Sequence, residues 1–283
     1  MKKSLLIVVL AVLCLVAEAQ IQTPAASPAG SVSTTVGLTD IKIQYSRPRA
    51  KGRKIFGDAA SGALVPNGAI WRTAANNGTK ITFGDDVTVE GTAVPKGEYQ
   101  LITWPGATEW TIALLKESIG GNTDAYDKSK EAVSFKVKPT KLTEKVEMFT
   151  INIGDVSDDN KSARIELAWE NTSVKFSVGV DFDAKVMKSI DTYTKVNPGN
   201  YYTAAVYYLE NNKDLNKALE WITLADKNNP DQFWILHQKA KIQKALGDKK
   251  GAIETANASL KAAKEANNRD YQNMNAELIK SKK

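Results

Sequence analysis

The spacing of apolar residues changes once along this chain, and the change divides it in two. From Ser31 to about Asp183 apolar and polar residues alternate, as in Ile41-Lys42-Ile43 and Val174-Lys175-Phe176. Alternation puts every second side chain on one face of a β-strand. After Asp183 the apolar residues follow a helical spacing instead. The pattern predicts an α+β protein of two domains, an antiparallel β-sandwich over residues 31–183 and an α-helical domain over residues 184–283.

The N-terminus has the three parts of an export signal. Lys2 and Lys3 precede an apolar run, and Ala17-Glu18-Ala19 fits a small-x-small cleavage site. We therefore predict a signal peptide over residues 1–19, a flexible linker over residues 20–30, and a periplasmic or secreted mature protein. The apolar run is too short to give the mature chain a stable membrane span.

Cysteine and histidine are too scarce for several kinds of chemistry. The single cysteine, Cys14, lies inside the signal, where lipid attachment is the alternative to cleavage after Ala19. The mature chain then has no disulfide, cysteine-based metal site or cysteine nucleophile. His237 is the only histidine and belongs to the helical half, so we expect it to pack there rather than to serve a catalytic triad or a zinc site.

Other motifs that would indicate chemistry are missing from the sequence. There is no Gly-x-x-x-x-Gly-Lys and no Gly-x-Gly-x-x-Gly after a strand, so nucleotide binding has no support. A basic segment with little aromatic content in an exported protein argues against nucleic acid. We expect no metal and no cofactor, and the sequence favours a non-enzymatic protein.

A cationic segment interrupts the predicted strands. Five cations and no acid fall within eight residues, namely Arg47, Arg49, Lys51, Arg53 and Lys54. Residues 184–283 carry 17 cations and 11 carboxylates, which leaves 19 cations and 20 carboxylates for residues 20–183. The segment therefore stands out on a mildly acidic domain, and we expect it to form a long structured loop.

Two interpretations of this region remain open. Guanidinium groups bind carboxylate, sulfate or phosphate oxygens, and tryptophan rings stack on sugars, which suggests an anionic or carbohydrate ligand. Alternatively, the arginines bind backbone carbonyls and the tryptophans lie in the core. The candidate ligand-binding residues are Arg47, Arg53, Trp71, Arg72, Asn76 and Trp104.

The same region resembles a known family. Its characteristic words occur in order as Ile43-Gln44-Tyr45-Ser46-Arg47-Pro48, Lys51-Gly52-Arg53-Lys54-Ile55-Phe56-Gly57, Leu64-Val65-Pro66-Asn67-Gly68, Trp71-Arg72-Thr73-Ala74-Ala75-Asn76 and Pro95-Lys96-Gly97-Glu98-Tyr99. Over about residues 27–170 the chain is similar to the domain of unknown function 2911 family of exported bacterial proteins. The resemblance implies a compartment and an architecture but no reaction. Ala74 stands where the family pattern usually has glycine.

The helical half has the spacing of paired helices. Small residues at Ala205, Ala218 and Ala225 would let two antiparallel helices approach closely, and Leu246-Gly247-Asp248 supplies a turn between two more. Over residues 199–266 the chain resembles tetratricopeptide repeats, followed by a capping helix after Asn268. Such repeats usually bind a peptide or protein partner, although these helices could simply pack on one another. The candidate partner-binding residues are Tyr202, Tyr208 and Trp234.

These observations lead to one functional expectation and two alternatives. We expect an exported, non-enzymatic binding or scaffold protein of the bacterial envelope. Its helices would engage a protein partner, and its cationic loop would hold an anionic or carbohydrate ligand. The first alternative is a glycan-acting enzyme that uses a pair of carboxylates. The second is a purely structural envelope component whose arginines hold the loop in place.

Overall fold

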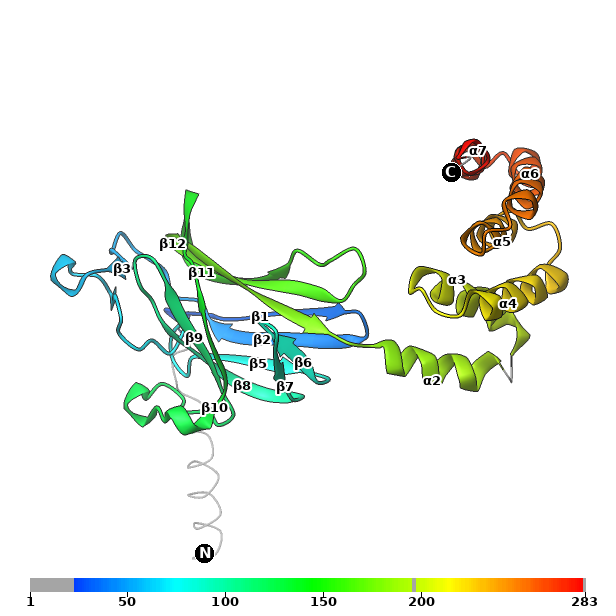
Figure 1. Cartoon of the computed structure of the whole chain (residues 1–283). Helices are drawn as coiled ribbons and strands as arrows, with labels where there is room; N and C mark the ends of the chain where they lie inside the picture. The colour runs from blue at the N-terminus through cyan, green and yellow to red at the C-terminus, as the bar shows by residue number, and fades with distance from the viewer. Residues whose placement is uncertain (1–22, 195–196, 282–283) are drawn as a thin grey trace, which may run out of the picture. The chain divides into compact units, whose positions relative to one another are not determined.

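The computed structural model describes residues 23–194 and 197–281. The predicted signal peptide and the start of the linker lie outside the described residues. The chain forms two compact units, which divide between Phe182 and Asp183. The first contains antiparallel sheets and the second contains helices, so the predicted α+β class is confirmed (Figure 1).

The first unit is built from two main sheets. One has the strand order β1-β2-β5-β8-β9-β10 and the other β11-β12-β6-β7, and all pairings within them are antiparallel. The strands are β1 (Ala29–Val36), β2 (Thr39–Ser46), β5 (Thr79–Phe83), β6 (Val87–Val89), β7 (Thr92–Val94), β8 (Gly97–Trp104), β9 (Trp110–Leu115), β10 (Glu131–Val137), β11 (Thr140–Gly154) and β12 (Ser162–Val180).

The alternation in the sequence sets which face of each strand is buried. In β2 the residues Ile41, Ile43 and Tyr45 are buried while the alternating Asp40, Lys42 and Gln44 are exposed. The Tyr45 hydroxyl donates to the Ile151 carbonyl of β11 at 3.3 Å, so a core side chain links the two sheets. Apolar burial of this extent is the main source of stability in a unit without disulfides.

The cationic segment is irregular, as predicted. Between β2 and β5 the chain forms only the two-residue strands β3 (Phe56–Gly57) and β4 (Val65–Pro66) and the short 3₁₀ turn η1 (Ala59–Ser61). β3 and β4 pair with each other in parallel. Trp71 makes a single bridge to Thr103 of β8 rather than a strand.

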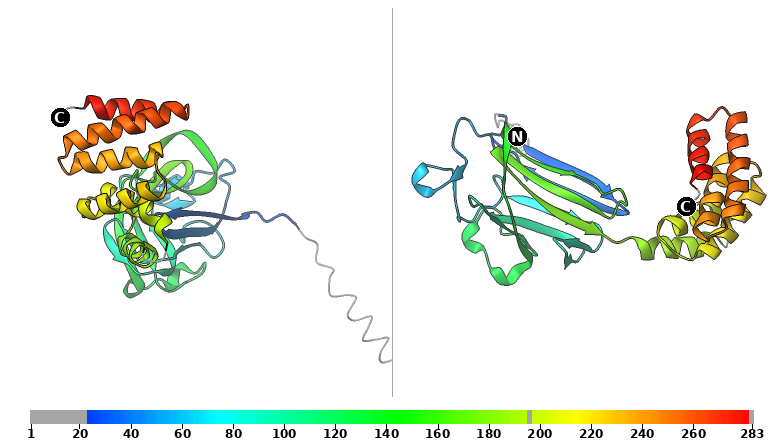
Figure 2. Two further views of the ribbon diagram at one scale, coloured as in Figure 1. Left: turned by 90° about the vertical axis from the view of Figure 1, so that its right-hand side faces the viewer. Right: turned by 45° about the horizontal axis from the view of Figure 1, so that its top comes forward.

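The second unit consists of helices that pack in chain order. They are α2 (Asp183–Thr194), α3 (Tyr201–Glu210), α4 (Leu215–Asn228), α5 (Phe233–Ala245), α6 (Lys249–Glu265) and α7 (Arg269–Lys280). Figure 2 shows α3 to α7 stacked side by side.

Local sequence explains where these helices begin and why they lie close together. Asp214, Asp248 and Asn268 cap the first turns of α4, α6 and α7 by accepting backbone N–H groups. Ala205 and Ala218 are fully buried between α3 and α4, as their small size predicted. The helix α2 is described as far as Thr194; Lys195 and Val196 lie outside the described residues.

Candidate binding sites

Two of the candidate arginines hold the backbone in place. The Arg47 Nε donates to the Phe149 carbonyl at 3.3 Å, and its Nη2 donates to the Thr150 hydroxyl at 3.1 Å. The Arg53 Nε and Nη2 donate to the carbonyls of Ala50 and Arg49 at 3.0 and 2.7 Å. These contacts match the interpretation in which the arginines anchor the loop, and they occupy donors that an anion would need.

Arg72 and Asn76 belong to a contorted loop. Thr73, Ala74, Asn76 and Gly78 all have positive φ, at 55°, 103°, 54° and 80°. The Arg72 Nε is buried and has no hydrogen-bond partner among the described residues. Asn76 is exposed, and its amide donates to the Ser46 hydroxyl at 3.0 Å.

Trp71 belongs to the core. It is 7% exposed, its ring stacks on Trp169 at 5.8 Å and 19°, and its indole N–H donates to the Ala74 carbonyl. Phe56, Trp110 and Phe149 meet the same ring edge to face. The bulk of this cluster explains the burial, and the ring face is not available to stack on a sugar.

Trp104 lies at a cleft, which we call the Trp104 cleft. This hollow of about 450 Å³ is also lined by Tyr126, Glu109, Glu131 and Lys128. The half-buried Trp104 ring meets Tyr126 edge to face at 5.0 Å. Burial, and then the hydrogen bond that Tyr126 donates to Glu131, raise the pKa of Tyr126 to about 12. The tyrosine therefore stays protonated and can act as a donor at any physiological pH.

The six candidate ligand residues thus do not form one site. Only Trp104 lines the Trp104 cleft. Tyr126 and Glu131 are not among the residues predicted from the sequence. The loop between β9 and β10 and the start of β10 bring them to the cleft. No periodic signal marks Tyr126, because it follows a short 3₁₀ turn, η2 (Thr123–Ala125).

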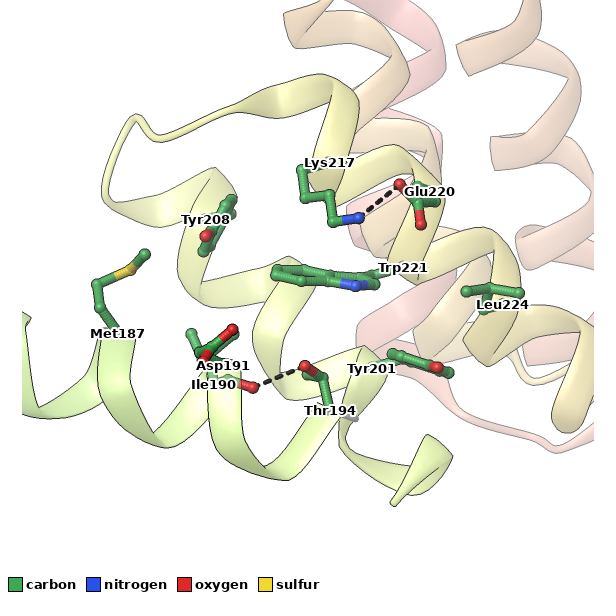
Figure 3. A pocket seen from close by; sticks show the side chains of 10 residues that line it. All are labelled: Met187, Ile190, Asp191, Thr194, Tyr201, Tyr208, Lys217, Glu220, Trp221 and Leu224. Atoms are coloured by element: carbon green, nitrogen blue, oxygen red, sulfur yellow. Dashed lines mark hydrogen bonds and ion pairs between the residues drawn. The ribbon is translucent and has the colours of Figure 1, made fainter. Parts of the chain in front are cut away.

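In the helical unit, Tyr208 lines a groove of about 470 Å³ formed by α2, α3 and α4 (Figure 3). Its ring meets the Trp221 ring edge to face at 4.9 Å. Lys217 lies 5.3 Å from the Trp221 ring centre and pairs with Glu220 at 2.8 Å. The charges that border this groove near Trp221 are therefore neutralised within α4.

Tyr202 and Trp234 lie elsewhere in the helical unit. Tyr202 is half-buried, and burial followed by the nearby Tyr271 raises its pKa. Trp234 is 37% exposed and meets Phe233 edge to face. Neither lines the groove of Tyr208, so the three candidate partner residues do not line one groove together.

A second groove crosses α3, α5 and α7, and we call it the lysine groove. It encloses about 650 Å³ between Leu209 of α3, Lys241 and Lys244 of α5, and Met274 and Leu278 of α7. Both lysines are half-buried, while Met274 is 38% exposed. Lys244 donates to the Ser281 hydroxyl at 2.7 Å, whereas no ion pair is recorded for either lysine in the described chain.

His237 borders the lysine groove from within a buried polar network. Its Nδ1 lies 2.9 Å from the Asn275 side-chain oxygen, and the Asn275 amide donates to the Ser259 hydroxyl at 2.8 Å. Burial lowers the pKa of His237 despite the Asn275 contact, which opposes that shift. The side chain packs, as the sequence analysis expected.

Within residues 23–194 and 197–281, no group of three or more His, Cys, Asp or Glu is placed to hold a metal ion. None of the helices in this part of the chain combines the length and apolar character that crossing a bilayer requires.

Comparison with known families decides the classification of the first unit. A family model described as "Protein of unknown function (DUF2911)" matches residues 27–178. The chain belongs to the DUF2911 family. No curated protein and no solved structure matches the chain.

The DUF2911 match ends two residues before β12 does, so it spans nearly all of the sheet unit and none of the helices. The cationic segment, the Trp71 cluster and the Trp104 cleft all lie within the DUF2911 region. The lysine groove and the groove of Tyr208 lie outside it. The tetratricopeptide resemblance therefore rests on the helical packing alone.

Proposed function

We propose that this chain is an exported, non-enzymatic binding protein of the bacterial envelope, and that its helical unit holds an acidic, partly apolar segment of a protein partner. The lysine groove carries this proposal. Leu209, Met274 and Leu278 offer apolar surface, and Lys241 and Lys244 offer half-buried cations.

Charge favours this kind of partner. Residues 184–283 have six more cations than carboxylates, so an acidic segment is attracted at long range as well as in the groove. In the groove itself Glu277 is one acid against two lysines. An amphipathic helix or an extended segment with alternating acidic and apolar residues would satisfy both features.

Peptide binding tests the proposal directly. The full mature chain is titrated into fluorescent peptides that are apolar and acidic, or apolar and basic. We expect the acidic set to bind, with an affinity that falls as salt rises. Replacing Lys241 and Lys244 together by Glu should weaken binding at least tenfold.

Lys249 and Lys250 provide a matched control. Both are exposed at the start of α6 and neither lines the lysine groove, so replacing them by Glu makes the same charge change elsewhere. An equal loss in the control pair would mean that only net charge acts, and the groove would lose its role. Binding of basic peptides in preference would reject the proposal.

For the DUF2911 unit, the arginine contacts make an anionic ligand at Arg47 or Arg53 less favourable. The carbohydrate form of the ligand hypothesis is supported instead by Trp104, whose half-exposed ring lines a cleft with hydrogen-bonding neighbours.

A glycan-acting enzyme is the second candidate, and one observation favours it. Glu109 and Glu131 line the same cleft as Trp104, which places two carboxylates at one hollow. Against it, Glu109 pairs with Lys136 at 2.7 Å and Glu131 accepts from Tyr126 at 2.5 Å. Release of reducing ends from polysaccharides by the natural chain, abolished in Glu131→Gln, would establish the enzyme.

A further inference from the structure

The Trp104 cleft has a neighbour on the same side of the sheet unit. A second hollow of about 380 Å³, which we call the Phe56 pocket, is lined by Phe56, Asn67, Trp110, Thr140 and Asn171 among others. Gly106 lines both hollows, and the consecutive residues Asn67 and Gly68 line one each. The two hollows therefore share an edge.

That edge is formed by two turns that are bonded together. The Gly68 N–H donates to the Pro105 carbonyl at 2.7 Å and so joins the turn at residues 66–68 to the turn at residues 105–106. Gly106, which lines both hollows, and Gly68, which lines the Trp104 cleft, carry no side chain. A Cβ on Gly68 would meet nothing within 4 Å, so the space beside Gly68 is open, whereas at Gly106 the Glu109 carbonyl occupies that direction.

The two linings have the same chemical character. The Trp104 cleft combines two aromatic rings with the hydroxyls of Thr111 and Ser134 and with two carboxylates. The Phe56 pocket combines the half-buried Phe56 ring and the margin of the buried Trp110 with the amide of Asn171, the hydroxyl of Thr140 and the Lys141 ammonium group. A sugar ring has apolar C–H faces and hydroxyl groups around its periphery. Aromatic rings can pack on the C–H faces, and hydrogen-bonding groups can bind the hydroxyls.

Charge selects among sugars. Glu109 and Glu131 of the Trp104 cleft are balanced by Lys128 and by Lys141 of the Phe56 pocket, and Glu109 also pairs with Lys136 at 2.7 Å, so the two linings carry no excess charge of either sign. The hydroxyl groups of a sugar supply donors for the two carboxylates, whereas no excess of cations attracts the sulfate or carboxylate groups of an acidic ligand. The geometry disfavours an acidic polysaccharide and favours a neutral one.

We propose that the two hollows are adjoining subsites for one neutral oligosaccharide, whose chain crosses the glycine edge at Gly68 and Gly106. The volumes lie at the small end of the range of about 300–1,000 Å³ that ligand sites occupy, so each hollow suits a short part of a chain rather than a long one. The inference rests on the carbohydrate half of the proposed function and adds the length, the path and the charge of the ligand.

Two changes test the inference: the length of the oligosaccharide, and a side chain added at the edge between the two hollows. Isothermal titration of the mature protein uses neutral gluco-, manno- and N-acetylglucosamine sugars from monomer to hexamer, with sulfated and carboxylated oligomers as the acidic arm. We expect affinity to rise at least tenfold from monomer to the longer oligomers of one series. Trp104→Ala should lower affinity at least tenfold for all lengths.

Gly68→Asn distinguishes the contribution of the edge to binding from that of the hollows. Asn tolerates the φ of +78° at this position, and its side chain would stand above the edge. We expect Gly68→Asn to weaken the binding of long oligomers while leaving the binding of the monomer unchanged. Gly62→Asn is the matched control, because Gly62 has a φ of +68°, has equally open space and lines neither hollow.

The outcomes distinguish the inference from the proposal beneath it. In one outcome, sugar binding is lost in Trp104→Ala and yet shows no dependence on oligomer length and no effect of Gly68→Asn. That result would overturn the joined subsites and leave a single carbohydrate site. Stronger binding of the acidic oligomers overturns the neutral ligand. No heat from any sugar overturns both, and none of these results affects the peptide assay of the helical unit.

Discussion

Ala74 is the residue at which this chain departs most clearly from the family pattern, and its backbone conformation is strained. Its φ is 103°, a conformation that glycine adopts freely and alanine does not. The strain is on the order of 1–3 kcal/mol, whereas the buried methyl contributes about 0.8 kcal/mol and the greater freedom of glycine in the unfolded chain costs about 0.5–1 kcal/mol. For a strain of about 2 kcal/mol, the middle of that range, we expect Ala74→Gly to raise the free energy of unfolding by about 0.5 kcal/mol, as measured by urea denaturation.

The next residue controls for the flexibility that glycine adds. Ala75 is not among the residues with positive φ, so Ala75→Gly relieves no strain. It should lower stability by about 0.5–1 kcal/mol, through the greater freedom of the unfolded chain. Destabilisation by both substitutions would show that the conformation at Ala74 is not strained.

His237 gives the helical unit a pH dependence of known sign. Its pKa in the folded chain is below the ordinary value of 6.5, chiefly because of burial. Between 6.5 and that lower value the unfolded chain binds more protons, so stability falls as pH falls through this window. Urea unfolding followed by helical circular dichroism should show this slope, and His237→Gln should remove it.

A slope of stability in this pH range can be assigned to His237 because the chain has no other histidine. Proton NMR of the imidazole ring gives its pKa independently of unfolding. Titration of the ring at or above 6.5 would contradict both the burial of His237 and the predicted slope.

At the scale of elements, Gln100 of β8 holds the long loop between β9 and β10. It is 1% exposed; its amide donates to the Gly120 carbonyl at 2.8 Å, and its oxygen accepts from the Ile119 N–H at 2.7 Å. Gln100→Met keeps the length but leaves the half-buried Gly120 carbonyl and Ile119 N–H without these partners. We expect a loss of about 2–4 kcal/mol in unfolding free energy.

Limited proteolysis locates the effect. Trypsin should cut Gln100→Met faster than the natural chain at Lys116 or Lys128, which flank the released loop. Gln44→Met makes the same exchange at an exposed position of β2 and should change stability by less than about 0.5 kcal/mol. Equal cleavage in all three chains would mean that Gln100 does not secure the loop.

For the elements themselves the sequence was a good guide, because their signals are local. Alternation predicted β2 and β12, and the capping helix predicted after Asn268 is α7. The anchoring of the cationic segment was left as one of two alternatives, because it depends on distant partners. The Arg47 guanidinium meets a carbonyl 102 residues away, a distance in sequence that no periodicity encodes.

The whole molecule repeats this contrast between local and distant information. The change of apolar period predicts a division after Asp183, because each period is a property of its own segment; the compact units divide between Phe182 and Asp183. The Trp104 cleft could not be assembled in the same way. It needs Gly68, Trp104 and Tyr126 from three different loops and strand ends, which only the sheet brings together.

Each unit has a hydrophobic core of its own, which leads to the last prediction. The helical core contains Ala205, Ala218, Trp221, Ile222 and Ile242, and the sheet core contains none of them. A segment of about 100 residues can bury enough apolar surface to fold alone. We expect residues 183–283, expressed by themselves, to be helical by circular dichroism and to unfold cooperatively in urea.

Ile222 shows whether such a fragment has the native core. It is fully buried in α4, so Ile222→Ala should lower the unfolding free energy by about 2–5 kcal/mol in the fragment and in the helical signal of the full chain alike. Exposed Ile253 of α6 is the control, because the same substitution there removes little buried surface. A fragment that is helical yet melts without cooperativity, and that does not respond to Ile222→Ala, would show that the helices need more of the chain to form their core. The peptide measurements on the lysine groove would then be meaningful only in the intact protein.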